Sequence, residues 1–207
     1  MKSAGREAIL ARIREQLRGV ETVARPRRIT RPRVDPATAG RRFVERLKKA
    51  SASVAVVERW SSVGESVALY LHGEGLPLRL VRAPDAELDT ISWPDGMEVR
   101  HAQGKVQPQA GLSLAVAGVV ESGTLVLASG PDNPTSLNFL SDHHIVVLPA
   151  RRLVLHLEDV WPQLRKRGLP RAVNFITGPS LSADVEQTLQ LGAHGPRKLH
   201  VIVVKSA

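Results

Sequence analysis

Apolar residues alternate with polar ones in short segments from residue 53 onward, which is the pattern of β-strands in a packed sheet. Strands are predicted at residues 54–57, 78–81, 97–101, 144–148, 173–176 and 199–204. The segments between them predict helices at residues 64–71, 157–167 and 183–191. Because strands and helices alternate along the chain, the sequence predicts an α/β fold.

One strand turns directly into the next between residues 116 and 128. Val116 and Val120 lie on one side of an extended segment, and Leu125 and Leu127 resume the two-residue period after it. Gly123 provides the permissive backbone that a tight reversal needs, so a hairpin is predicted. Its turn presents three polar side chains, either as ordinary turn residues or as part of a functional site: Glu121, Ser122 and Thr124.

The N-terminal quarter has a different character. Residues 5–18 predict a basic helix, and a proline-containing linker then leads to Asp35, which caps a second basic helix. We therefore divide the chain into a helical N-terminal arm, residues 1–50, and an α/β domain, residues 51–207. The first helix carries a narrow apolar stripe of Ile9, Ile13 and Leu17.

Charge is segregated between these two parts. Residues 1–49 contain 15 Lys and Arg against 5 Asp and Glu, a net +10, which leaves 14 against 15, a net −1, for the rest. Nucleic-acid binding by the arm is one interpretation. We favour packing of the arm on the body or on a second copy of the chain, a homo-oligomer, because aromatic residues that stack on bases make up only 3% of the chain.

Composition excludes several classes of protein. The 207 residues are 43% apolar, as in soluble globular proteins. They include no cysteine, which excludes disulfides, a thiolate nucleophile and a thiolate-held iron–sulfur cluster in this chain. No apolar run approaches the roughly 20 residues of a membrane span, and the N-terminus lacks a signal core. We expect a cytoplasmic protein that holds no cofactor itself.

A second polar motif lies near the C-terminus. Residues 176–186 read Ile-Thr-Gly-Pro-Ser-Leu-Ser-Ala-Asp-Val-Glu, and residues 192–196 read Gly-Ala-His-Gly-Pro ahead of the last strand. Together with Glu121 and the Ser-Gly-Thr that follows it, these segments resemble the LUD-domain family, and specifically its LutC-type lactate utilization proteins. The resemblance covers roughly residues 110–204.

That resemblance implies a Rossmann-like open sheet of the NagB/RpiA/CoA-transferase-like fold. It also implies a subunit of an iron–sulfur system that oxidises lactate to pyruvate, with the iron–sulfur clusters carried by partner proteins. The contribution of this chain would be to bind a small carboxylate or to serve assembly.

The segment 177–182 is the expected ligand loop. Open α/β sheets bind ligands beyond the carboxyl ends of strands, and the N-terminus of a following helix offers N–H groups to a carboxylate or phosphate. The glycine-flanked His194 would donate to the same anion. We expect ligand contacts from both polar motifs, that is, from Ser122, Gly123, Thr124, Thr177, Gly178, Pro179, Ser180, His194 and Gly195.

Glu121 is the expected catalytic residue, since a carboxylate beside a glycine turn can act as nucleophile or general base. The Glu-x-Gly segment is similar to the catalytic segment of CoA transferases, so a stand-alone enzyme of the CoA-transferase-like or sugar-phosphate-isomerase-like type is the alternative. Its other use is to bond the amides of its own turn. No metal site is expected, because Asp184 and Glu186 point apart on the predicted helix and His143 and His144 face opposite sides of a strand.

Overall fold

The computed structural model describes residues 2–19, 30–104, 107–183, 189–191 and 195–206. Contacts divide the chain into two units, Met1–Arg31 and Pro32–Ala207. The first unit contains helix α1 (Lys2–Gln16), which confirms the helix predicted at residues 5–18. The apolar stripe of this helix is exposed.

Helix α2 belongs to the second unit. The Asp35 side chain accepts a hydrogen bond from the Ala37 amide at 3.0 Å and caps the short 3₁₀ helix η1 (Pro36–Thr38), as the sequence predicted. Helix α2 (Ala39–Lys49) follows and buries Phe43 and Leu47. From the sequence we grouped this helix with the arm, but its apolar face packs in a core of the α/β unit.

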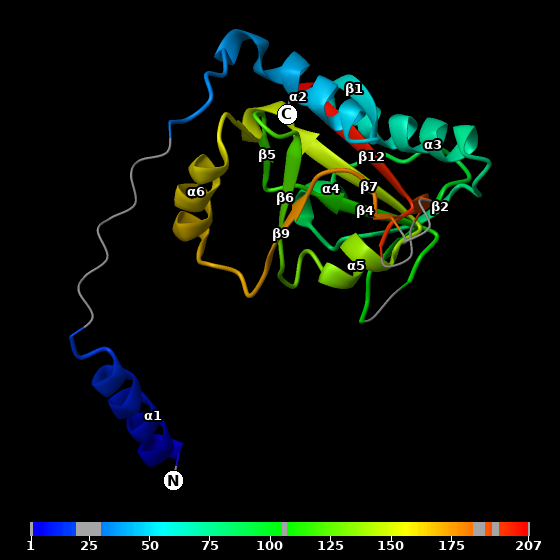
Figure 1. Cartoon of the computed structure of the whole chain (residues 1–207). Coiled ribbons are helices and arrows are strands. Elements are labelled where there is room, and N and C mark those ends of the chain that lie inside the picture. The colour runs from blue at the N-terminus through cyan, green and yellow to red at the C-terminus, as the bar shows by residue number, and fades with distance from the viewer. Residues whose placement is uncertain (1, 20–29, 105–106, 184–188, 192–194, 207) are drawn as a thin grey trace. The chain divides into compact units, whose positions relative to one another are not determined.

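Six parallel strands form the central sheet, in the order β1, β12, β7, β4, β2 and β3 (Figure 1). Their bounds are β1 Ser53–Arg59, β2 Arg79–Arg82, β3 Glu98–His101, β4 Ala110–Leu114, β7 His143–Pro149 and β12 Lys198–Ser206. Apart from β4, each of them overlaps a strand predicted from the apolar pattern. The continuous apolar run 145–148 suits a parallel strand covered on both faces, and the predicted α/β open sheet is confirmed.

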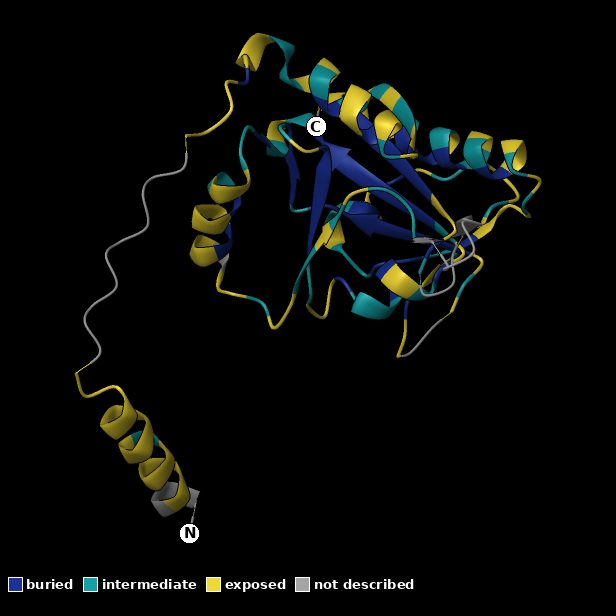
Figure 2. Ribbon diagram, viewed as in Figure 1, coloured by how far each residue is buried: buried dark blue, intermediate teal, exposed yellow. Residues whose placement is uncertain are grey.

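Alternate residues of β7 face two different cores. Ile145 and Val147 pack with helix α3 (Val63–Gly73) on one face of the sheet. Val146 and Leu148 pack with the buried residues of α2 on the other face. Figure 2 shows the central strands buried, whereas the outer sides of α2 and α3 are exposed.

A smaller sheet of four strands packs against the core that α2 covers, in the order β8, β5, β6 and β9. Its strands are β5 Ala117–Val119, β6 Thr124–Ala128, β8 Leu153–Val154 and β9 Val173–Ile176. Strands β5 and β6 are antiparallel around Gly123, which confirms the predicted hairpin. Strand β9 pairs antiparallel with β6, so the strand predicted at residues 173–176 lies outside the central sheet.

The helix predicted at residues 183–191 is wrong for the described residues. Strands β10 (Leu181–Ala183) and β11 (Leu189–Leu191) pair antiparallel there. Both three-residue segments alternate apolar and polar side chains with the two-residue period of strands. The structure follows this period and not the local helix signal. The helical interpretation rested on Asp184 and Glu186 as acids of a first turn, and both lie outside the described residues.

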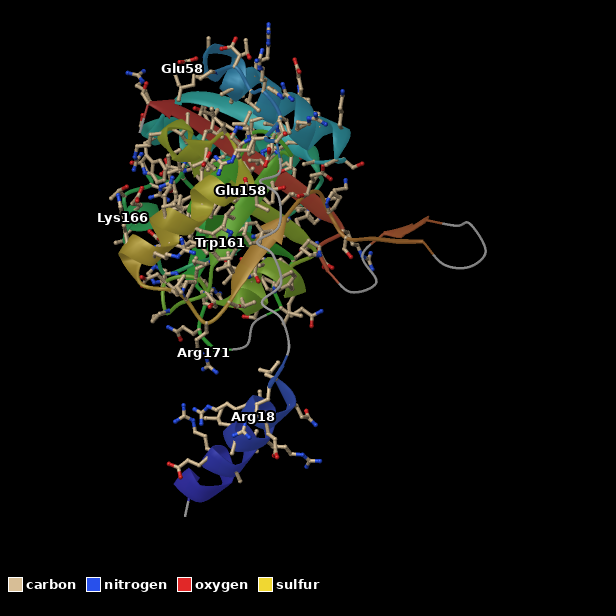
Figure 3. All side chains as sticks on the ribbon, turned by 60° about the vertical axis from the view of Figure 1, so that its left-hand side comes forward. Arg18, Glu58, Glu158, Trp161, Lys166 and Arg171 are labelled. Atoms are coloured by element: carbon tan, nitrogen blue, oxygen red, sulfur yellow. The ribbon has the colours of Figure 1, made fainter. Side chains whose placement is uncertain are left out.

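The remaining helices are short: α4 Ala86–Asp89, α5 Thr135–Leu140, α6 Val160–Arg167, η2 Trp60–Ser62, η3 Ala150–Arg152 and η4 Leu157–Asp159. Together, η4 and α6 confirm the helix predicted at residues 157–167. Trp161 of α6 lies beside β9, with its ring 5.9 Å from that of Phe175 (Figure 3). Within the described ranges, no helix has the length and apolar character that crossing a bilayer requires.

Candidate functional site

The two polar turns predicted from the sequence lie side by side. Strands β6 and β9 pair with Leu125 opposite Ile176, which brings the start of β6 next to the end of β9. The Thr124 Oγ1 atom is 2.6 Å from Thr177 Oγ1, and Ser122 Oγ is 2.7 Å from Thr124 Oγ1. A chain of three hydroxyl groups therefore joins the two turns.

The close approach of α2 accounts for the glycines of both turns. Gly123 and Gly178 have φ values of 74° and 88°, in the left-handed region that favours glycine. A β-carbon on Gly123 would lie 2.5 Å from the Arg46 Cβ, and one on Gly178 would lie 2.3 Å from the Ala50 carbonyl oxygen. Packing of the C-terminal end of α2 thus explains both glycines without a ligand.

Glu121 holds the start of η4. Its carboxylate accepts a hydrogen bond from His156 Nδ1 at 2.8 Å and another from the Leu157 amide at 2.8 Å. The side chains of Glu121 and His156 are only 19% and 12% exposed. Such a pair can orient an imidazole for acid–base chemistry, but neither residue lines the pocket that adjoins the second turn.

That pocket has a volume of about 260 Å³. It lies between α5, β9 and the amino ends of β7 and β12, because His144 and Leu199 are the second residues of those two strands. From the predicted ligand set, its lining contains Thr177, Gly178, Pro179, Ser180 and Gly195. The other lining residues are Asn138, Phe139, His144, Phe175, Ile176, Pro196 and Leu199. We call this space the α5 pocket.

The position of the α5 pocket corrects part of the sequence interpretation. We predicted a loop that leaves the carboxyl end of a central strand and enters a helix, but β9 belongs to the smaller sheet and β10 follows the loop. The helix N-terminus proposed as an anion site is therefore absent at residue 183. Ser122, Gly123 and Thr124 do not line the pocket, and His194 lies outside the described residues.

Three buried polar side chains form a connected group, which we call the floor of the α5 pocket because two of them, Asn138 and His144, belong to lining residues. Ser113 Oγ donates a hydrogen bond to Asn138 Oδ1 at 3.0 Å, and His144 Nε2 lies 3.1 Å from the same Ser113 oxygen. All three side chains are fully buried. Among the described residues, Asn138 Nδ2 and His144 Nδ1 have no hydrogen-bond partner, although both belong to residues that line the pocket. Unpaired buried polar atoms are costly, so these two atoms are the polar groups of the pocket-lining residues that most need a partner.

Burial also fixes the charge of this floor. It lowers the pKa of His144 to about 3, because the charged imidazolium would lose its hydration. The imidazole is therefore neutral at physiological pH and carries one N–H.

Sequence reasoning missed Ser113 and Asn138 and considered His144 only as a metal ligand. As predicted, His143 and His144 face opposite sides of β7: His143 Nδ1 is 2.9 Å from the Tyr70 hydroxyl on α3, whereas His144 bonds Ser113. No group of three or more metal-binding side chains occurs in the described part of the chain. The sequence did contain one signal for Ser113 and Asn138. Each is a lone polar residue between apolar ones, in Leu-Ser-Leu and Leu-Asn-Phe respectively.

A second cavity, of about 350 Å³, lies at the carboxyl end of β1, where open α/β sheets commonly bind ligands. Its polar side chains bond one another. Trp60 Nε1 donates to Thr90 Oγ1 at 2.8 Å, and Arg151 pairs with Glu87 at 3.3 Å. Since these groups already have partners, the α5 pocket is the stronger site.

Comparison with known proteins adds the family. A family model described as LUD domain matches residues 40–204. The Lactate utilization protein C of Geobacillus kaustophilus is 34% identical over 125 residues, which are 58% of this chain and 52% of that protein. The chain thus spans about half the length of this relative.

Two further proteins match over more of the chain. An uncharacterized protein of Neisseria meningitidis is 29% identical over 184 residues, covering 78% of each chain. The crystal structure of a DUF162 family protein from Deinococcus radiodurans has a TM-score of 0.62 at 22% identity, covering 84% of this chain and 100% of that one. The latter likeness shows the shared fold.

Proposed function

The chain belongs to the LUD-domain family, and on that basis we propose that it is a component of a lactate utilization system. Its own part in that system is to bind a small carboxylate in the α5 pocket, with lactate as the first choice. The observation that supports this most is the family match over residues 40–204, together with relatives named Lactate utilization protein C.

The lining of the α5 pocket suits a small molecule with one apolar end. Phe139 and Phe175 are partly exposed and offer apolar surface on which a methyl group can pack. The described lining contains no Lys or Arg side chain. A bound carboxylate would therefore keep its charge toward the solvent, since burying an unpaired carboxylate is costly.

Other proteins would carry out the electron transfer in such a system. The 207 residues contain no cysteine, so thiolate-bound iron–sulfur clusters would belong to partners. The exposed side of α2 suits an acidic partner surface, because it presents the cationic side chains of Arg41, Arg46, Lys48 and Lys49. Assembly with those partners is the second part of the proposed role.

Reconstitution tests this function. The chain would be purified and combined with the products of neighbouring genes, and lactate-dependent reduction of an artificial electron acceptor would be measured with and without it. We expect activity to require the chain. The pocket-blocking variant Ser180→Leu should abolish that activity, whereas Ser61→Leu, an exposed serine on η2 outside the pocket, should retain it. Equal activity with the chain omitted would contradict the proposal.

A further inference from the structure

We infer that the outer edge of strand β9 is a docking site for an extended, acidic segment of a partner protein that carries one large apolar side chain. This inference goes beyond the proposed function and does not depend on lactate binding. It is carried by the open edge of β9, by the rings of Trp161 and Phe175, and by the cationic side chains near the start of the strand.

Strand β9 leaves backbone groups unpaired at the edge of the smaller sheet. Among the described strands it pairs with β6 alone, at the end of the order β8, β5, β6 and β9. The Ser129 amide donates to the Ala172 carbonyl at 2.9 Å, so Ala172 faces β6, and the alternation of an antiparallel pair makes Asn174 face it too. Val173 and Phe175 therefore direct their N–H and C=O groups away from β6. Within the described part of the chain, these outward groups bond no other backbone group.

Two exposed aromatic rings lie beside this edge. Trp161 of α6 and Phe175 of β9 are 36% and 38% exposed, and their ring centres are 5.9 Å apart (Figure 3). Residues directly opposite each other in paired strands have their side chains on the same face of the sheet. In a strand added to β9, the side chain opposite Phe175 would therefore lie on the face of these two rings. A large apolar or aromatic side chain gains most from that contact.

Cationic side chains lie at the end of the surface where β9 begins. Arg171 is exposed and comes four residues before Phe175. Arg165 is exposed and lies one turn after Trp161 on α6, so these two side chains share a face of the helix. Neither guanidinium has an acidic partner in the described ranges. Acidic residues on either side of the apolar side chain would therefore complement this surface in charge.

Strand addition uses all three features together. The outward backbone groups of Val173 and Phe175 would bond the added strand whatever its sequence, whereas the rings and the arginines would select its side chains. The same positive charge also discourages pairing of this edge with a second, equally basic edge. An acidic partner segment is thus the occupant that the edge fits best.

Titration of the whole chain with a short peptide tests this inference. The probe is acetyl-Asp-Glu-Val-Phe-Val-Asp-Glu-amide, and its counterpart has Lys at all four acidic positions. Binding would be followed by NMR without lactate, at about 0.15 M salt, where the Debye length is about 8 Å and distant charges contribute little. We expect a Kd below about 1 mM for the acidic probe and at least about tenfold weaker binding of the Lys counterpart.

Hydrogen exchange distinguishes strand addition from other modes of binding. With the acidic probe at roughly ten times its Kd, the Val173 and Phe175 amides should exchange up to about tenfold more slowly, because their N–H groups become bonded. The Asn174 amide faces β6 already and should change little. Binding of the probe without slower exchange at Val173 and Phe175 would overturn the inference.

Two charge reversals give a matched comparison. Arg171→Glu should weaken binding of the acidic probe about tenfold, since it places a carboxylate at the start of β9. Lys166→Glu should change the affinity less than about twofold, because Lys166 lies about 140° around α6 from Trp161, on the side away from β9 (Figure 3). The unmodified chain gives the primary result, so the test does not depend on how well either variant folds.

The other outcomes also decide the matter. No binding of the acidic probe would overturn the inference, and equal affinity for the two probes would overturn the choice of an acidic partner. Protection of the Val173 and Phe175 amides that grows with the concentration of the free chain would show that a second copy occupies the edge, which would also contradict the inference. Because lactate is absent throughout, a failure here is distinct from a failure of the proposed function.

Discussion

The α-carbon of Gly178 packs against the carbonyl oxygen of Ala50, so closely that a β-carbon on Gly178 would lie 2.3 Å from that oxygen. This contact fixes the second polar turn to the C-terminal end of α2. The glycine of the first turn meets the same helix end, at Arg46. Helix α2, which we had assigned to the arm from the sequence, therefore positions the second turn beside the α5 pocket.

The Gly178→Ala variant should lose about 2 kcal/mol or more of unfolding free energy, because the new methyl group meets backbone and φ is positive. Urea denaturation measures this loss. Gly40→Ala is the matched control, since Gly40 lies in α2 with open space around its α-carbon, and it should be neutral or stabilising. Equal stability of both variants and the unmodified protein would show that α2 does not press on the turn.

Replacing Glu121 with Ala should reduce the unfolding free energy by about 1–3 kcal/mol, since it leaves His156 and the Leu157 amide without their partner. Glu121→Gln keeps an acceptor for the amide and should cost less. Ligand affinity should not change, because Glu121 does not line the α5 pocket. Full stability combined with lost activity would instead favour Glu121 as a reactive group, the role expected from the sequence.

Acid should destabilise the protein through its buried histidines. Burial lowers the pKa of His144 to about 3, and burial, partly offset by Glu74, lowers that of His200 to about 4. The unfolded chain takes up these protons near pH 6.5, so stability is complete above that pH and falls as the pH drops toward the two lowered values. Between pH 7 and pH 5, each histidine should remove about 2 kcal/mol.

This pH effect is measured as the shift in urea midpoint between pH 7 and pH 5. The double variant with His144→Gln and His200→Gln should show a smaller shift than the unmodified protein. An unchanged shift would mean that both histidines ionise in the folded state.

Deleting residues 1–31 should leave the α/β unit folded, because that segment forms a separate unit. The unfolding midpoint of the shortened chain should equal that of the full chain. Salt-sensitive binding of the full chain to DNA or RNA, lost in the shortened one, would support the nucleic-acid interpretation of the arm that we disfavour.

The apolar pattern was sufficient to locate most of the central strands and the hairpin around Gly123. It could not show that the strand at residues 173–176 pairs with β6. The sequence of so short a strand does not reveal which strand it pairs with, or whether the pairing is parallel or antiparallel. Residues 183–191 were assigned to a helix because Asp184 and Glu186 resemble the acids of a first helical turn. The strands β10 and β11 show the two-residue alternation of a strand over only three residues each, which is too short to stand out in the sequence.

The candidate site was only half predictable. The motif at residues 177–180 and Gly195 were expected as ligand contacts, and the structure places them on the α5 pocket. Ser113, Asn138 and His144 come from three separate elements, and only the fold brings them together. A single polar residue in an apolar run predicts burial with a partner, but not which partner.

The most direct test of the central claim is a lactate titration followed by the NMR signals of the Asn138 side-chain amide. Asn133 provides an internal control, because its buried side-chain amide bonds the Ala128 carbonyl and does not line the α5 pocket. We predict a saturable shift of the Asn138 signals and a constant position for those of Asn133. If the Asn138 signals stay in place while lactate is added to saturation, the pocket does not bind lactate and the account is wrong.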